Sequence, residues 1–150
     1  MKSGGATMQR GSRVFLDTSA IIAGLNSPTG AAGVILAACF SGDIAPVISP
    51  QVIEEAERNI LAKFPELDGA WRSFLLIPPH VTKSPTIRQV REAYALLPTS
   101  DASILASAIA EIPDMLVTWD KKHLLRATVV ASVTFPILTP GDFLTRFFYD

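Results

Sequence analysis

Acidic residues follow two apolar strings of the sequence and begin two of its helical patterns, which is where the ligand site of an open α/β protein forms. Asp17 closes the string VFLD, and Asp120 follows the string LVTW. Asp101 opens the alanine-rich string DASILASAIAE, and Glu54 or Glu55 lies one turn into another predicted helix. Burying a carboxylate such as Asp17 costs free energy unless it is paired or bound to a metal. The four positions therefore predict one cluster of acids.

Each acid alone also has an ordinary structural explanation. Asp101 could complement the positive N-terminal end of its helix, and Asp120 could cap the short helix predicted after it. Glu54 and Glu55 belong to a charged helix face that could be solvated. The set is more informative than its members, because carboxylates that converge repel one another and raise one another's pKa values.

The chemistry of such a cluster is that of a hard divalent cation. Mg²⁺ and Mn²⁺ prefer oxygen ligands, and we expect an all-oxygen site without the His or Cys ligands of zinc. A bound metal of this kind lowers the pKa of an attacking water and offsets the charge on a phosphate group. The cluster therefore favours phosphodiester hydrolysis, with no dedicated nucleophile.

The composition is that of one domain. The chain has 150 residues, 49% of them hydrophobic and 18% charged, and no apolar run approaches the ~20 residues of a membrane span. Residues 1–12 lack the apolar middle region of a signal peptide, so we expect a loose leader, a domain over 13–150 and a cytoplasmic location. The single cysteine, Cys39, excludes an intramolecular disulfide. The net charge of −1 neither supports nor excludes nucleic acid as a partner.

The elements that must position the acids alternate along the chain. Their strands are apolar throughout, which indicates a parallel sheet covered on both faces. Strands are expected at 13–17, 44–48, 115–118 and 133–137. Helices are expected at 18–25, 31–40, 86–97, 100–111 and 121–125, after Ser49-Pro50, around 71–76 and after Pro140.

Four strings, in this order and at this spacing, resemble the PIN-domain nucleases: VFLDTSAII, ISPQVIEEAERNI, DASILASAI and LVTWDKKHLL. They span residues 14–125 and are followed by the string ILTPGDFL, which many members share. The sequence is similar to prokaryotic stand-alone PIN proteins, a group that includes VapC-type toxins. The resemblance implies a three-layer α/β/α fold, with a twisted parallel sheet flanked by helices.

The resemblance also implies the roles of the acids, as both catalytic residues and ligands of Mg²⁺ or Mn²⁺. Asp17 and Asp101 would hold the metal, and Asp120 would bind metal or orient water. Glu55 matches the glutamate of the family better than Glu54, because Ala56 then matches the hydrophobic residue that follows it. The choice depends on a register of one residue, so Glu54 stays in reserve.

Side chains beside these acids are further candidates. Three hydroxyl groups would orient carboxylates or water molecules: Thr18, Ser19 and Thr118. Trp119 either stacks a base or packs against the protein. The residues that flank Asp120 either contact phosphate groups or form a solvated surface: Lys121, Lys122, His123 and Arg126.

The expected function is that of a metal-dependent endoribonuclease, a hydrolase of RNA phosphodiester bonds, and a toxin of a type II toxin–antitoxin pair is a further expectation. Its partners would be RNA, a cognate antitoxin and a second copy of the chain, with the apolar segment 71–79 as a candidate dimer patch and no membrane. The alternative is an inactive PIN fold that binds nucleic acid or protein. Such members usually lose an acid, whereas all four positions are occupied here.

A haloacid-dehalogenase-like phosphatase would need a second aspartate where this sequence has Ser19.

Overall fold

A single parallel sheet organises the chain, and the computed structural model describes residues 11–147 of it. The sheet has five strands in the order β3-β2-β1-β4-β5. All four strand pairs are parallel. The strands are β1 (Ser12–Leu16), β2 (Ile44–Ile48), β3 (His80–Val81), β4 (Met115–Val117) and β5 (Ile137–Leu138). The leader expected at 1–12 lies outside the described residues except for its last two positions, and β1 already begins at Ser12.

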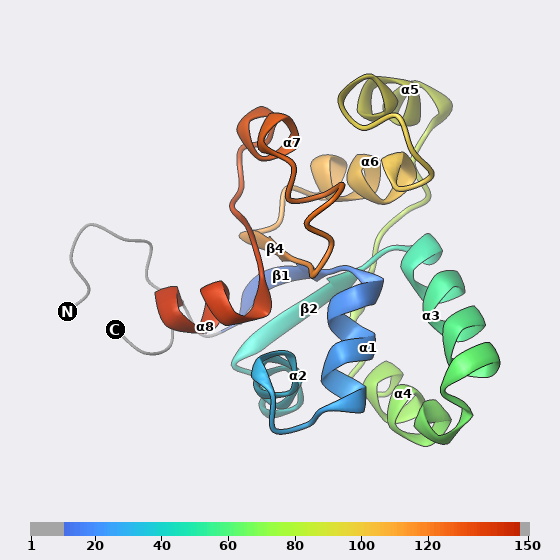
Figure 1. Ribbon diagram of the computed structural model, residues 1–150, viewed down its shortest axis with the longest axis vertical. Coiled ribbons are helices and arrows are strands. Elements are labelled where there is room, and N and C mark those ends of the chain that lie inside the picture. Colours follow the sequence, from blue (N-terminus) through green and yellow to red (C-terminus); the bar gives the residue numbers. More distant parts are fainter. Residues whose placement is uncertain (1–10, 148–150) are drawn as a thin grey trace.

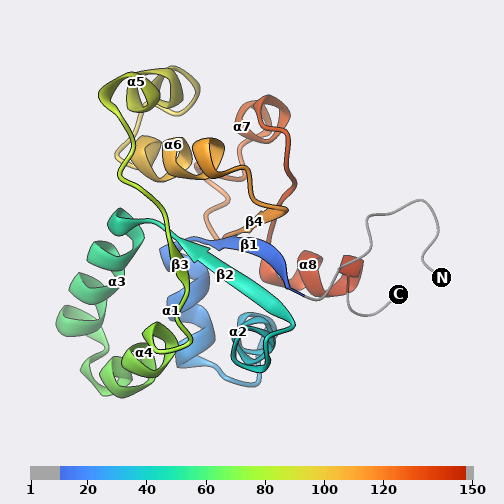
Figure 2. The same ribbon diagram turned by 180° about the vertical axis from the view of Figure 1, so that it is seen from behind.

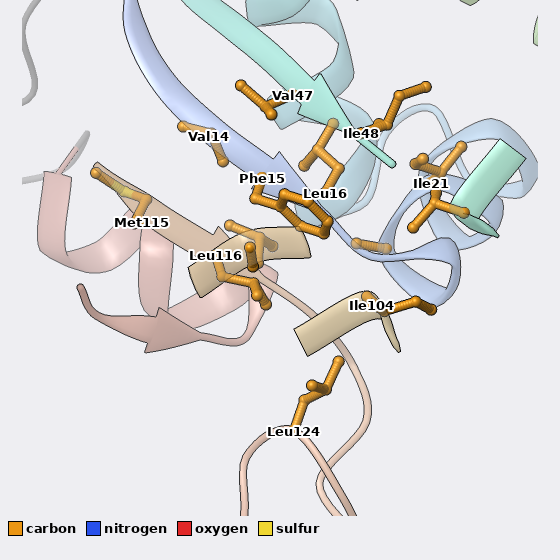
Figure 3. Close-up of a cluster of buried hydrophobic side chains, with 14 of the residues drawn as sticks. Val14, Phe15, Leu16, Ile21, Val47, Ile48, Ile104, Met115, Leu116 and Leu124 are labelled. Atoms are coloured by element: carbon orange, nitrogen blue, oxygen red, sulfur yellow. The ribbon is translucent and has the colours of Figure 1, made fainter. Parts of the chain in front are cut away.

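The central strand β1 is apolar on both faces because helices cover both. Val14 and Phe15 are fully buried, and Leu16 is 1% exposed. Figure 3 shows these side chains packed with Leu116 of β4 and Val47 of β2. The sequence of β1 does not alternate between apolar and polar residues because both faces of the strand are buried, as the sequence predicted.

The helices form a layer on each side of the sheet, so the expected three-layer α/β/α fold is confirmed (Figures 1 and 2). α1 and α2 pack together on one side, whereas α6 and α7 lie on the other side with α5 outside α6. α3 packs against α1 and α6, and α8 packs against α2 and β5. The bounds are α1 (Thr18–Asn26), α2 (Ala31–Ser41), α3 (Pro50–Lys63), α4 (Asp68–Leu75), α5 (Ile87–Leu96), α6 (Ala102–Glu111), α7 (Ala127–Ser132) and α8 (Pro140–Phe147).

The order of the strands reverses beside β1. The chain first runs outward from β1 to β2 and β3, and it then returns to place β4 on the other side of β1. The carboxyl ends of β1 and β4 therefore flank the switch point at which ligands of open α/β sheets bind. Asp17 follows β1 directly, and Asp120 follows β4 after two residues.

Local signals account for the starts of two helices. The Ser49 hydroxyl accepts a hydrogen bond of 3.2 Å from the amide of Val52, and Pro50 occupies the first turn of α3. Thr86 and Gln89 form a capping box at the start of α5. Both helices begin where such signals predict them.

Two expectations about local structure are wrong. Residues 121–125 form a turn in place of a helix, and the helix lies at α7 instead. The last strand begins at Ile137, because Pro136 has no amide hydrogen and only its carbonyl takes part, accepting from the amide of Leu116 at 2.9 Å. The dimer patch expected at 71–79 stays a prediction: Trp71 and Phe74 are buried in the core, whereas Leu76 is 82% exposed.

None of the helices within residues 11–147 has, by itself, the length and hydropathy of a membrane-spanning segment. α1 and α2 reach the necessary length only as a pair, and the two helices are bent by 94° relative to each other.

Candidate metal centre

All four acids singled out in the sequence line one pocket of about 490 Å³ at the switch point. They come from the end of β1, from α3, from the start of α6 and from the loop after β4: Asp17, Glu55, Asp101 and Asp120. Glu54 points away from this pocket, and its carboxylate lies 3.5 Å from the guanidinium of Arg58 on the exposed face of α3.

Asp17 is the most buried of the four acids, with 6% of its surface exposed. Its amide donates to the Val117 carbonyl at 3.1 Å, which ties the end of β1 to β4. Its carboxylate oxygen Oδ2 accepts hydrogen bonds from the hydroxyls of Thr118 at 2.8 Å and Ser19 at 2.9 Å. Asp17 occupies the position before α1 but does not cap that helix with its side chain.

Burial raises the pKa of Asp17 above its ordinary value. Hydrogen bonds from Thr118, Ser19 and the amide of Thr18 oppose the rise, and the negative charge of Glu55 adds to it. The protein thus holds a carboxylate in a place that disfavours its charge. A nearby cation would relieve that cost.

The same two hydroxyl groups position the loop after β4. The Ser19 hydroxyl accepts from the amide of Trp119 at 3.0 Å, and the Thr118 hydroxyl accepts from the amide of Asp120 at 2.9 Å. Each hydroxyl therefore donates to Asp17 and accepts from the loop that carries Asp120. These contacts fit the predicted role of the two hydroxyls in orienting carboxylates.

Glu55 is directed toward the pocket by two side chains. The Thr18 hydroxyl donates to its Oε1 at 3.2 Å, and the Gln51 amide donates to its Oε2 at 3.3 Å. The Gln51 amide also lies 3.2 Å from the carbonyl oxygen of Ser100, which connects α3 to the loop before α6. Ala56, the next residue, is fully buried. Its side of the helix faces the core, which fixes the direction of Glu55.

Asp101 and Asp120 meet on either side of a histidine. The Nδ1 atom of His123 lies 3.0 Å from Oδ2 of Asp101 and 3.4 Å from Oδ2 of Asp120. A ring nitrogen therefore lies beside the two carboxylates, a neighbour that the expectation of an all-oxygen site did not include. His123 stands three residues after Asp120, and the turn at 121–125 is what brings its ring back over both acids.

Burial raises the pKa of Asp101 to about 6, and the negative charges of Asp17 and Asp120 add to the rise. The contact with His123 has the opposite effect on this pKa. Asp101 stands at the position before α6, and its side chain makes no capping hydrogen bond to that helix.

Two further side chains of α3 line the pocket and were not predicted. Asn59 and Lys63 follow Glu55 at intervals of four residues, so the three side chains share one helix face. The Asn59 amide donates to the carbonyl oxygen of Glu55 at 2.9 Å. The four-residue spacing is visible in the sequence, and it was the signal that could have found these residues.

The surface after β4 is aromatic and basic. Trp119 is 42% exposed, so it is not a core residue. The three cationic residues that follow it in the chain are all exposed: Lys121, Lys122 and Arg126. They lie beside the acidic pocket without lining it.

The donor set fits a divalent metal ion. Carboxylate oxygens from four segments surround one pocket, and Lys63 is the one cationic side chain of the described residues that lines it. Hard cations such as Mg²⁺ and Mn²⁺ take carboxylate ligands of this kind and retain several waters. The open pocket leaves room for those waters.

Comparison with solved structures shows the same fold in two proteins. VapBC2 from Rickettsia felis, solved bound to a DNA fragment from their promoter, is 18% identical, with 84% of this chain and 96% of that chain covered and a TM-score of 0.56. PAE2754 from Pyrobaculum aerophilum is 19% identical, with 90% of this chain and 94% of that chain covered and a TM-score of 0.60. A search of curated proteins finds no match.

A comparison with family sequence profiles matches residues 13–122 to the PIN domain. This stretch covers more than half of the chain and contains β1 except for Ser12, β2, β3, β4 and all four acids of the pocket. The strings that suggested the resemblance lie within it or end just beyond it. The chain belongs to the PIN domain family.

Proposed function

We propose that this protein is an endoribonuclease that depends on Mg²⁺ or Mn²⁺. The observation that carries the proposal is the convergence of Asp17, Glu55, Asp101 and Asp120 in one pocket at the switch point of the sheet. Members of the PIN family are nucleases, and an inactive member would be expected to have lost part of this set. The four acids are accordingly proposed as the metal ligands and catalytic residues.

Each acid is proposed to have the role that the resemblance to the family implies. Asp17, Glu55 and Asp101 would hold the metal, and Asp120 would bind metal or orient a water molecule. A bound divalent metal would lower the pKa of the attacking water and offset the charge on the phosphate. Thr118 and Ser19 keep the Asp17 carboxylate in one orientation, which reduces reorganisation during the reaction.

The proposed substrate is inferred from the residues in and beside the pocket. Lys63 lines it from α3, and the exposed Lys121 and Lys122 follow Asp120. Cationic side chains of this kind contact backbone phosphates, and an exposed tryptophan such as Trp119 can stack on an unpaired base. These features favour single-stranded RNA as the substrate, and we place the reaction in the cytoplasm.

The test is cleavage of a single-stranded RNA by the full chain. Mg²⁺ or Mn²⁺ should support cleavage, and excess chelator should abolish it. Asp17→Asn and Asp101→Asn should each lower the rate at least about a hundredfold, the scale of losing a key electrostatic stabiliser. Asp68→Asn, on the exposed face of α4, should leave the rate unchanged.

Two results would contradict the proposal. Full activity in excess chelator would exclude the metal, and normal cleavage by both site variants would place the active site elsewhere. RNA binding without cleavage by the parent protein would instead favour the binding-only alternative.

We also propose that the protein acts as a toxin with a separate antitoxin chain and forms a homodimer. The support for a partner is the fold that it shares with VapBC2. A small gene directly upstream that encodes a DNA-binding protein, and whose product co-purifies with this chain, is the expected finding. Expression of the chain alone should slow growth, and light scattering should give the mass of a dimer.

A further inference from the structure

His123, Asp101 and Asp120 each offer one donor atom, and these three atoms are spaced like neighbouring ligands of a metal ion. Its Nδ1 atom lies 3.0 Å from Oδ2 of Asp101 and 3.4 Å from Oδ2 of Asp120, and donor atoms of the three residues all lie within 4.8 Å of one another. Adjacent ligands in an octahedral shell are about 3.0 Å apart when the ligand bonds are about 2.1 Å long. The ring nitrogen therefore stands where a third ligand would stand.

The polypeptide holds the ring in this position. The His123 amide donates to Oδ1 of Asp120 at 3.0 Å, so the second oxygen of that carboxylate, Oδ2, is the one nearer the ring. The Leu125 amide closes the turn on the carbonyl oxygen of Asp120 at 3.0 Å. Leu124 is fully buried and fastens the turn to the core, as Figure 3 shows. The side chains of Asp101, Asp120 and His123 keep 21–28% of their surface exposed, which leaves the group open to an ion from solvent.

A single hydrogen bond accounts for the contact of His123 with Asp101 but not for the approach of Asp120. Nδ1 of a histidine carries at most one hydrogen, and Oδ2 of Asp120 lies 3.4 Å from it as an ionic contact without a hydrogen bond. Here two carboxylate oxygens from separate segments approach the same nitrogen. A cation between them would interact favourably with all three atoms, and it would offset the repulsion between Asp101 and Asp120.

We propose that His123 Nδ1 is a ligand of the divalent metal, together with Asp101 and Asp120, and that this nitrogen makes the site prefer Mn²⁺ over Mg²⁺. Imidazole binds transition-metal ions well, whereas Mg²⁺ strongly prefers oxygen. The inference rests on the metal-dependent function proposed above and concerns which metal serves it. The site would thus be tuned for manganese by a residue outside the four acids.

The experiment measures metal binding by the tag-free full chain without any RNA. Pulsed electron paramagnetic resonance of bound Mn²⁺ should show a hyperfine coupling to ¹⁴N, because the ligand nitrogen contacts the ion. Calorimetric titration should show tighter binding of Mn²⁺ than of Mg²⁺. The measurement on the parent protein does not depend on the folding of any variant.

His123→Asn is the informative variant, since its amide can still donate a hydrogen bond to a carboxylate but supplies no imidazole. It should abolish the ¹⁴N coupling and weaken Mn²⁺ binding by at least about tenfold, because even losing an outer partner of a ligand costs 10–100-fold in affinity. Mg²⁺ binding should change far less. His80→Asn is the control, as His80 is the other histidine of the chain and contacts Glu111 at 2.8 Å, away from the pocket.

The two proposals fail in different ways. Mn²⁺ that binds the parent protein without a ¹⁴N coupling, or an unchanged Mn²⁺ to Mg²⁺ affinity ratio in His123→Asn, would overturn the role of His123 and leave the nuclease proposal standing. If neither ion binds the parent protein, the metal-dependent function is overturned as well.

Discussion

The Asp17 carboxylate shows how single residues prepare the site. Burial disfavours its charge, and the two hydroxyl groups of Thr118 and Ser19 are the side chains that stabilise it. With Glu55 and Asp101 close by, the metal-free site concentrates negative charge around a carboxylate that is itself buried. Such a site lowers the stability of the metal-free fold and favours binding of a cation, which is a common property of functional sites.

The pH dependence of the metal-free protein follows from Asp101. Its pKa of about 6 in the folded protein lies above the value of an unfolded aspartate, so the folded state binds the proton more tightly. Protonation therefore stabilises the fold: this contribution is fully present below the unfolded pKa and is lost as the pH rises through about 6. Urea unfolding in chelator should show a smaller gain from pH 7 to pH 5 for Asp101→Asn than for the parent. Equal pH dependence of the two proteins would contradict this.

A comparison of Glu55 with Glu54 tests the register of α3. Glu55→Gln should lower both Mn²⁺ affinity and the cleavage rate, because Glu55 lines the pocket and is held there by Thr18 and Gln51. Glu54→Gln should stay within a few-fold of the parent, because successive helix residues point about 100° apart and Glu54 faces Arg58. A manganese titration of both variants gives the ranking. The reverse ranking would move the fourth ligand to Glu54.

At the scale of elements, α3 performs two tasks on two faces. Its buried side chains pack on the core: Val52, Ala56 and Ile60. Its other face presents Glu55, Asn59 and Lys63 to the pocket. The core face thereby sets the direction in which the functional face points, so any shift of the helix would move the candidate ligand with it.

The close packing at the start of α2 can be tested with glycine variants. A Cβ atom on Gly33 would lie 2.2 Å from the carbonyl oxygen of Pro28, which is backbone and cannot rotate away. We expect Gly33→Ala to lower the free energy of unfolding by about 1–3 kcal/mol, the usual cost of overpacking. Gly69→Ala is the matched control, because a Cβ there meets nothing within 4 Å and alanine favours the helix. Urea unfolding measures both, and equal stability of the two variants would refute the packing argument.

At the scale of the whole molecule, the pocket joins parts of the chain that are distant in sequence. Asp17 and Thr118 are 101 residues apart and share a hydrogen bond of 2.8 Å. The strand order places their two strands side by side, and α3 and α6 approach the same end of the sheet. The site therefore exists only when the complete fold is formed, which couples metal binding to folding.

Metal should accordingly stabilise the entire chain. At a metal concentration of a hundred times the dissociation constant, the gain is about 2.7 kcal/mol, and the melting temperature should rise by several degrees. Asp17→Asn should lose most of this rise. Its metal-free melting temperature should equal or exceed that of the parent, because the variant removes a buried charge. Thermal melts with Mn²⁺ and with chelator test both statements, and an equal metal response of the two proteins would contradict them.

The sequence by itself determined the parallel sheet and the starts of several helices. Apolar strings predict strands that are buried on both faces, and Ser49-Pro50 predicts the start of α3, because each of these signals acts between near neighbours. The acids at the ends of β1 and β4 could be placed for the same reason, since parallel strands end at one edge of a sheet. Asp101 and Glu54 or Glu55 stood out near the starts of two predicted helices, and the family strings then selected Glu55 over Glu54.

The tertiary structure alone decided what surrounds these acids. Asp101 meets His123 across 22 residues, and the meeting depends on the turn at 121–125, which sequence patterns had predicted as a helix. Lys63 reaches the pocket because the core face of α3 orients the whole helix. Local sequence patterns reflect hydrogen bonds between residues that are close in sequence and the polarity of those residues. The direction of a ring or a long side chain depends instead on packing between segments that meet only in the folded chain.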